Sequence, residues 1–161
     1  MATIVVEDGT GKTDSNSYIS EADFSTYATD RGVTISGTVA VLLIQAMDYI
    51  EEQPFKGDKG SDDQALQWPR SGVIIDGYSV DTDAIPVKLT EALCEAAIAI
   101  DGGDNPLSGV GRDIKRTKAG SVEVEYMDGA RSTTYLAALE NKLSNLLNSG
   151  SRGISAEVIR A

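Results

Sequence analysis

The segment 36–53 constrains the fold of this chain more than any other stretch, because its apolar residues follow a helical period. They recur at the i, i+3, i+4, i+7 spacing of one helix face: Val39, Leu42, Leu43, Ala46, Met47 and Ile50. A second apolar row, Val41, Ile44 and Tyr49, makes the apolar surface wider than the stripe of an ordinary surface helix. The sequence therefore predicts a central helix over 36–53, ended by Pro54, with partners on more than one side.

Three further helices are indicated by their caps and periods. Ser20 is a good N-cap for a helix that closes at Arg31 and Gly32, and Pro86 is well placed to open another. Ser132 or Thr133 caps the last helix, whose leucines alternate three and four apart: Leu136, Leu139, Leu143 and Leu146. We therefore expect a mainly α fold, a four-helix bundle in a single domain over residues 1–150.

Two segments lack a helical period. The segment 55–85 is predicted to form a long non-helical arm, and Trp68 is expected to pin it by burying its ring against the central helix. The segments 114–118 and 122–126 are predicted to form a small β-hairpin around Ala119 and Gly120.

The chain has no histidine and a single cysteine, Cys94. Without histidine the usual general base and the commonest zinc ligand are missing, and Cys94 lies among alanines and aliphatic residues that do not activate a thiol. We therefore expect no catalytic function, no metal and no cofactor. No signal peptide or long apolar run is present, so we expect a protein made in the cytoplasm that does not span a membrane.

The 161 residues carry a net charge of −11, which opposes tight binding to a phosphate backbone. The one dense group of basic residues is Arg112, Lys115, Arg116 and Lys118. These four residues are candidates for a DNA contact. Cross-strand pairing with Glu123 and Glu125 is the alternative, and it would neutralise much of the group.

The stretch Gly9-Thr10-Gly11-Lys12-Thr13 imitates the end of a phosphate-binding loop. The full pattern needs a glycine where this chain has Val6, together with a strand before the loop and a helix after it. A nucleotide-dependent enzyme acting through Lys12 therefore stays a minor alternative.

The C-terminal segment 151–161 is too far from the leucine seam to join the last helix, yet it is apolar. Its apolar residues are Ile154, Val158 and Ile159, and Arg152 and Arg160 stand near its two ends. This composition favours a docking tail that binds another protein.

Several motifs, taken in order, resemble a family of tailed-phage proteins. They are Asn16-Ser17-Tyr18-Ile19-Ser20, Ala46-Met47-Asp48-Tyr49-Ile50, the run from Gln64 to Gly72 with Trp-Pro-Arg-Ser-Gly, Ile85-Pro86, and Ile114-Lys115-Arg116 with Val122-Glu123-Val124-Glu125-Tyr126. The family is that of head-to-tail connectors, or adaptors, also labelled as a DnaT-like single-stranded-DNA-binding domain.

The resemblance implies a virion protein of the head–tail junction, without catalysis. Its partners would be the portal protein, neighbouring copies in a closed ring of about twelve, and a downstream tail or nozzle protein. Genomic DNA would pass through the ring without specific binding. Trp68, Arg70 and Tyr78 are then candidates for a subunit interface or an arm anchor, and Arg152, Ile154, Val158, Ile159 and Arg160 for docking on the portal. The alternative function is that of a single-stranded-DNA-binding replication protein.

Overall fold

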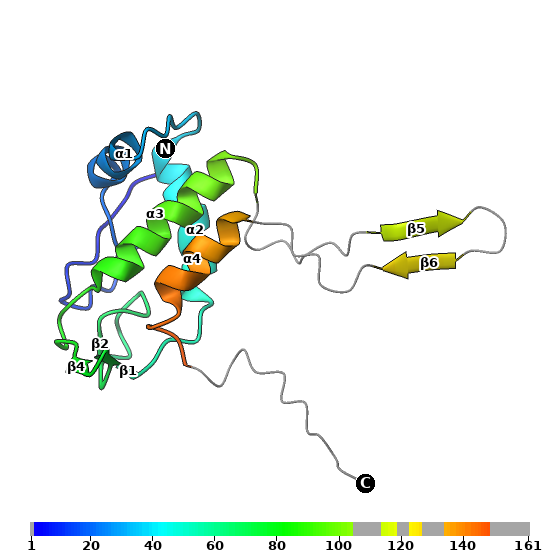
Figure 1. Ribbon diagram of the computed structural model, residues 1–161. Coiled ribbons are helices and arrows are strands. Elements are labelled where there is room, and N and C mark those ends of the chain that lie inside the picture. The colour runs from blue at the N-terminus through cyan, green and yellow to red at the C-terminus, as the bar shows by residue number, and fades with distance from the viewer. Residues whose placement is uncertain (1, 105–113, 119–122, 127–133, 149–161) are drawn as a thin grey trace, which may run out of the picture.

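A computed structural model describes residues 2–104, 114–118, 123–126 and 134–148, and the side chains of residues 2–104 and 138–148. These residues form four helices and three two-stranded antiparallel sheets (Figure 1). The helices are α1 (Glu21–Asp30), α2 (Val39–Glu51), α3 (Val87–Asp101) and α4 (Thr134–Leu143). The sheets pair β1 (Asp58–Lys59) with β2 (Arg70–Ser71), β3 (Ile74–Ile75) with β4 (Tyr78–Ser79), and β5 (Ile114–Lys118) with β6 (Glu123–Tyr126).

Helix α3 lies at the centre of the fold. It packs extensively against α2 and α4 and also contacts α1 (Figure 1). Within the described residues, α4 has no close backbone contact with α1 or α2. Most of α3 is buried, and the buried residues include Leu89, Leu93 and Ala97. The predicted helix 36–53 is present as the shorter α2. The helix that contacts each of the other three, however, is α3.

The predicted four-helix bundle is wrong. Helices α1 and α4 have ten residues each and are therefore only about 15 Å long, too short to line a common core along its whole length. Residues outside the helices fill the remaining part of the core: Tyr18, Phe55, Leu66, Trp68, Val73, Leu146 and Leu147.

The segment 55–85 contains no helix, as predicted, but the predicted arm is wrong, because much of this segment folds onto its own core. Phe55, Leu66, Trp68 and Val73 are all buried. The Trp68 ring packs edge-on against Phe55, with 5.9 Å between the ring centroids. The two short sheets β1–β2 and β3–β4 then hold the segment in a compact form.

Two helix starts agree with the predicted local chemistry. Ser20 caps α1, with its hydroxyl accepting a hydrogen bond from the amide of Asp23 at 3.1 Å. Pro86, predicted to be the first helical residue, stands at the N-cap of α3, which begins one residue later at Val87.

Helix α4 ends at Leu143, before the end of the predicted leucine seam. The chain turns there because the backbone of Asn148 donates to the carbonyl of Pro54 at 2.9 Å, and Lys56 donates to the carbonyl of Leu146 at 2.9 Å. Leu146 and Leu147 are nevertheless buried in the core beyond the helix end.

Two glycines allow backbone segments to approach closely. A Cβ at Gly57, whose φ is +71°, would lie 2.2 Å from the carbonyl oxygen of Ser71. A Cβ at Gly9, whose φ is +98°, would lie 1.8 Å from the carbonyl oxygen of Asp83. Any larger side chain at either position would push apart two segments that are distant in sequence.

The hairpin β5–β6 is drawn away from the helices (Figure 1) and contacts no other helix or strand of the described chain. Its predicted existence is confirmed, with the second strand starting at Glu123, one residue later than predicted. The register places Arg116 opposite Glu125 and Lys118 opposite Glu123, as the pairing alternative requires.

Cys94 is fully buried in α3, and burial raises the pKa of its thiol from 9.0 to about 12. Above pH 9 the unfolded chain therefore loses this proton while the folded chain keeps it, so folding stability falls as the pH rises. Between pH 8 and pH 10 we expect the wild type to lose roughly 1 kcal/mol more stability than the Cys94→Ala variant. Urea unfolding at the two pH values measures this difference, and equal losses in the two proteins would contradict it.

Candidate functional site

The glycine-rich loop near the N-terminus folds around the chain's own Glu7. The Glu7 carboxylate is 2% exposed and accepts hydrogen bonds from the backbone amides of Gly9, Gly11 and Lys12 at 2.9, 2.9 and 2.8 Å. It also accepts one from the Ser15 hydroxyl at 3.0 Å. Converging backbone amides are the device that binds anions in phosphate loops. Here the anion is an internal carboxylate, so these amides are already occupied.

Lys12 is engaged in the same loop. Its ammonium group donates to the carbonyl of Val6 at 2.8 Å and lies 2.9 Å from the Asp8 carboxylate. Hydrogen bonds from Thr10 and Lys12 lower the pKa of Asp8 to about 2. In a phosphate-binding loop the lysine side chain must be able to reach a phosphate. The Lys12 side chain is instead bound to two residues of its own loop, Val6 and Asp8.

The sequence 64–72 is anchored by a buried hydrogen-bond network. The Tyr18 hydroxyl donates to the Glu51 carboxylate and accepts from the backbone amide of Trp68 at 3.1 Å. The backbone amide of Gln67 donates to the other Glu51 oxygen at 2.7 Å. Burial raises the pKa of both Glu51 and Tyr18, so each of these groups favours its neutral form more than it would in water.

Arg70 is a second internal anchor. Its guanidinium group donates to the carbonyls of Lys56 and Gly57 at 2.7 and 2.5 Å, and to the side-chain oxygen of Gln67 at 2.7 Å. The residue is 8% exposed. A guanidinium group so fully used by its own chain has little capacity for binding a neighbouring subunit.

Tyr78 differs from the two other residues predicted for an interface or anchor. It lies on β4 and is 80% exposed. Trp68 and Arg70 thus anchor a segment inside the protein, and of the three only Tyr78 is free to touch another molecule.

The basic side chains of the described body, residues 2–104 and 138–148, are all engaged. Besides Lys12 and Arg70 there are five. Arg31 lies 3.4 Å from the centre of the Tyr27 ring, Lys56 donates to the Asn145 carbonyl, Lys59 donates to the Gln64 carbonyl, and Lys88 and Lys142 both pair with Glu91. No groove of unpaired lysines and arginines is left on this body for a nucleic acid.

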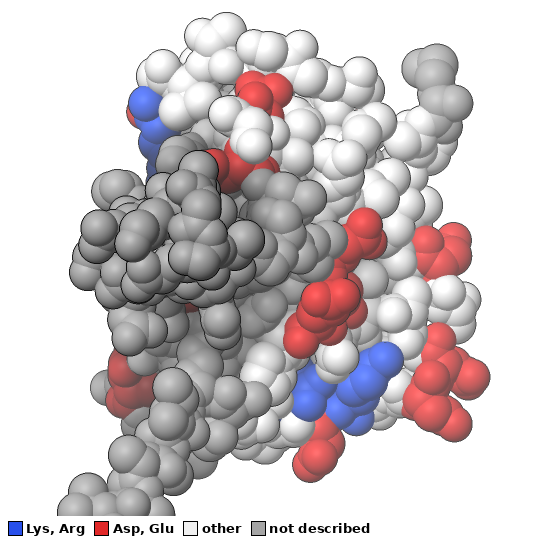
Figure 2. All heavy atoms as spheres, turned by 90° about the vertical axis from the view of Figure 1, so that its right-hand side faces the viewer, with Lys and Arg blue, Asp and Glu red and all other residues white. Residues whose placement is uncertain are grey.

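Charge is distributed unevenly along the chain. The body holds 7 of the 14 basic residues and 20 of the 25 acidic ones, a net charge of −13, and the rest of the chain has seven basic and five acidic residues, a net +2. Figure 2 shows acidic groups at separated places over the visible face, with the few basic groups lying beside acidic ones.

The candidate DNA-contacting residues lie in or next to β5. Lys115, Arg116 and Lys118 belong to the strand, and Arg112 lies outside the described residues. The predicted portal-docking residues Arg152, Ile154, Val158, Ile159 and Arg160 also lie outside them.

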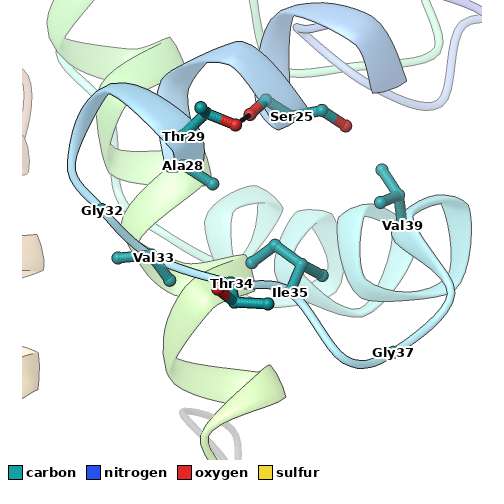
Figure 3. Close-up of a pocket in the computed structure, with 9 residues that line it drawn as sticks. All are labelled: Ser25, Ala28, Thr29, Gly32, Val33, Thr34, Ile35, Gly37 and Val39. Atoms are coloured by element: carbon teal, nitrogen blue, oxygen red, sulfur yellow. Dashed lines mark hydrogen bonds between the residues drawn. The ribbon is translucent and has the colours of Figure 1, made fainter.

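A pocket of about 450 Å³ between α1 and the start of α2 was missed by sequence reasoning (Figure 3). None of the residues that line it is charged: Ser25, Ala28, Thr29, Gly32, Val33, Thr34, Ile35, Gly37 and Val39. Val33, Ile35 and Val39 are half-buried against the core. The alternation of Val33 and Ile35 with polar residues was the available signal, but two apolar residues are too few to define a period.

None of the described helices is long and apolar enough to cross a membrane. Within the same residues, no group of three or more Asp, Glu and Cys side chains is placed to hold a metal ion.

Residues 2–161 match the family described as "Putative DnaT-like ssDNA binding protein". The chain therefore belongs to this family, which carries one of the two labels that the sequence motifs indicated. No curated protein and no solved structure matches the chain.

Proposed function

We propose that the protein is a structural subunit of a tailed-phage neck, a head-to-tail adaptor that forms a ring beneath the portal protein and performs no catalysis. The observation that carries this proposal is the acidic body, with a net charge of −13 and each of its seven lysines and arginines engaged by its own chain. A surface of this kind repels DNA phosphates, as the wall of a channel for moving DNA should.

The charge of a whole ring supports the same assignment. About twelve copies at −11 each bring a charge near −130 together, and salt screens it only over about 8–10 Å. Much of this charge must therefore face water or the lumen. The aspartates of the segment 55–85 that we expect near the lumen are exposed: Asp58, Asp62, Asp63 and Asp81. The downstream tail or nozzle protein would continue the channel, and the segment 151–161 would dock on the portal.

A single-stranded-DNA-binding replication protein is the second candidate, favoured by the family description and by the basic residues of β5. Such proteins combine a basic groove with exposed aromatic side chains on which bases stack. Among the described aromatic side chains, Tyr78 alone is largely exposed. The candidates for a DNA contact are therefore the dense group of basic residues outside the body, Arg112, Lys115, Arg116 and Lys118.

The two functions predict different results in the particle and in solution. If the protein is an adaptor, labelled copies lie at the neck of the virion, and loss of the gene leaves DNA-filled heads without tails. In fluorescence anisotropy at about 150 mM salt, single-stranded oligonucleotides bind no more tightly than about 1 μM, as expected for non-specific contacts. Replacing the four basic residues with alanine leaves this weak binding nearly unchanged. Tight, salt-dependent binding that the same variant abolishes, in particles with normal necks, would instead establish the replication protein.

A further inference from the structure

The β5–β6 hairpin has two free strand edges. Its strands form a sheet of their own, so within the described residues each strand pairs along one edge only. The hairpin contacts none of the other described helices and strands, and Figure 1 draws it away from them. An isolated two-stranded hairpin is at best marginally stable in water, and a free edge offers unpaired backbone N–H and C=O groups to another strand. Strands added at these edges would therefore stabilise it.

The register of the hairpin gives it two different faces, because residues paired across two strands share a face. One face carries Ile114 opposite Tyr126 and Thr117 opposite Val124, and a bulge between Ile114 and Arg116 brings Ile114 to this side. The other face carries the pairs Arg116–Glu125 and Lys118–Glu123. Hairpins placed edge to edge in the same orientation would join their largely apolar faces into one continuous surface.

The two free edges differ in charge. Strand β5 contains Lys115, Arg116 and Lys118 and no acidic residue, whereas β6 contains Glu123 and Glu125 and no basic residue. Two β5 edges brought together, or two β6 edges, would place like charges on neighbouring strands, which is destabilising. A β5 edge beside a β6 edge places opposite charges there instead. The free β5 edge is therefore complementary to the free β6 edge of a second copy.

Charge in the rest of the chain also favours a contact through the hairpin. The body has a net charge of −13, so the bodies of two copies repel each other. The segment 105–133, which contains the hairpin, has five basic and four acidic residues, a net +1. A contact made through this segment avoids the repulsion that a contact between two bodies has to overcome.

We propose that the β5 edge of one copy pairs with the β6 edge of the next, so that the hairpins of successive copies form one continuous antiparallel sheet. Because the two edges differ, the contact is heterologous and generates a ring when the rotation closes. A closed ring of hairpins leaves no strand edge free. This inference rests on the proposed function, since it supplies the contact between neighbours in the adaptor ring.

Exchanging the charges of the two strands tests the contact. The charge-exchanged protein carries five substitutions: Lys115→Glu, Arg116→Glu, Lys118→Glu, Glu123→Lys and Glu125→Lys. Opposite charges still face each other within its hairpin and between two of its copies, so it should associate with itself as the wild type does. Beside a wild-type copy, each of its edges meets an edge of like charge.

The measurement is native mass spectrometry of an equimolar mixture of the charge-exchanged protein and isotope-labelled wild type, both concentrated. Each protein should form its own oligomers. Mixed oligomers should be roughly tenfold rarer than random mixing would give, because several like-charge pairs oppose each mixed contact.

Two control variants accompany this measurement, and circular dichroism verifies that each protein is folded. Asp62→Lys with Asp63→Lys reverses two charges at exposed positions of the body, and this protein should mix with the wild type at random. Glu123→Lys with Glu125→Lys makes both strands basic and should prevent association. That variant also loses the pairs within its own hairpin, so the charge-exchanged protein, which regains them, gives the decisive result.

Three results would overturn the proposal. Random mixing of the charge-exchanged protein with the wild type would mean that the hairpin edges do not meet. A preference for mixed oligomers would mean that like strands pair with each other. A wild-type protein that stays monomeric up to its solubility limit would exclude the contact altogether.

The outcome separates this inference from the proposed function. A ring at the virion neck into which the charge-exchanged and wild-type proteins enter at random would disprove the contact and leave the adaptor assignment standing. Separate oligomers of the two proteins, formed by a chain that is absent from the neck, would establish the contact and disprove the adaptor.

Discussion

Replacing Trp68 with alanine is expected to lower the free energy of unfolding by about 3–5 kcal/mol. Trp68 is fully buried and packs edge-on against Phe55, and its backbone amide is held by the Tyr18 hydroxyl. Removing the indole leaves a large cavity between the helices and the segment 55–85. Chemical unfolding monitored by circular dichroism measures the loss.

Tyr78→Ala is the matched control for Trp68, because the sequence assigned the two residues to the same kind of surface. Tyr78 is 80% exposed, so its replacement should change stability by no more than about 0.5 kcal/mol. A small loss in the Trp68→Ala protein, accompanied by failed assembly, would mean that Trp68 acts between subunits and not within one.

Glu7→Ala is the second substitution with a large expected effect, a loss of about 3–5 kcal/mol. The carboxylate accepts from the amides of Gly9, Gly11 and Lys12 and from the Ser15 hydroxyl. Without it, several donors that converge on this buried carboxylate lose their acceptor, and each unsatisfied group costs about 1–3 kcal/mol before the loop relaxes.

Glu7→Gln and Asp14→Asn serve as controls for the loop. Glutamine keeps one acceptor oxygen but turns an NH₂ group toward backbone donors, so its loss should be large and somewhat smaller than that of alanine. Asp14 is exposed in the same loop, and Asp14→Asn should have little effect. Thermal unfolding of the three variants gives the comparison, and wild-type stability in Glu7→Ala would show that the amides find other acceptors.

The elements that sequence reasoning predicted well are those defined by neighbouring residues. The Ser20 cap, the apolar period of α3 and the strands of the β5–β6 hairpin each depend on residues within a few positions of one another, and all three are present. Local chemistry is readable because the partners are adjacent in the chain.

Features that depend on distant partners were not predicted. Tyr18 and Glu51 are 33 residues apart, and Lys56 reaches the Asn145 carbonyl across 89 residues. Contacts of this kind draw the segment 55–85 into the core and replace the expected bundle. Arg70 is another example of a role that depends on other positions. It is an internal anchor because its guanidinium group donates to three carbonyl or amide oxygens of other residues.

The candidate site was predicted only in part. Tyr78 was named from the sequence and lies exposed on β4, but two other exposed apolar residues, Ile74 and Val87, and the α1–α2 pocket were not. Ile74 stands in an apolar run that reads equally well as a buried strand. The pocket lies between α1 and the start of α2, and both helices contact α3, so it depends on packing between segments that a local pattern does not show.

The separation of the β5–β6 hairpin from every other described element has an evolutionary consequence. Helices α3 and α4 pack directly on each other, so the segment between them is a closed loop. The free energy of closing such a loop rises by only about 0.6 kcal/mol for each doubling of its length. The sequence and length of this loop can therefore change during evolution without lowering the stability of the body. Among relatives, the hairpin region should diverge fastest in sequence and length, following changes in whatever partner it meets, and the glycines and buried anchors of the body should drift slowly.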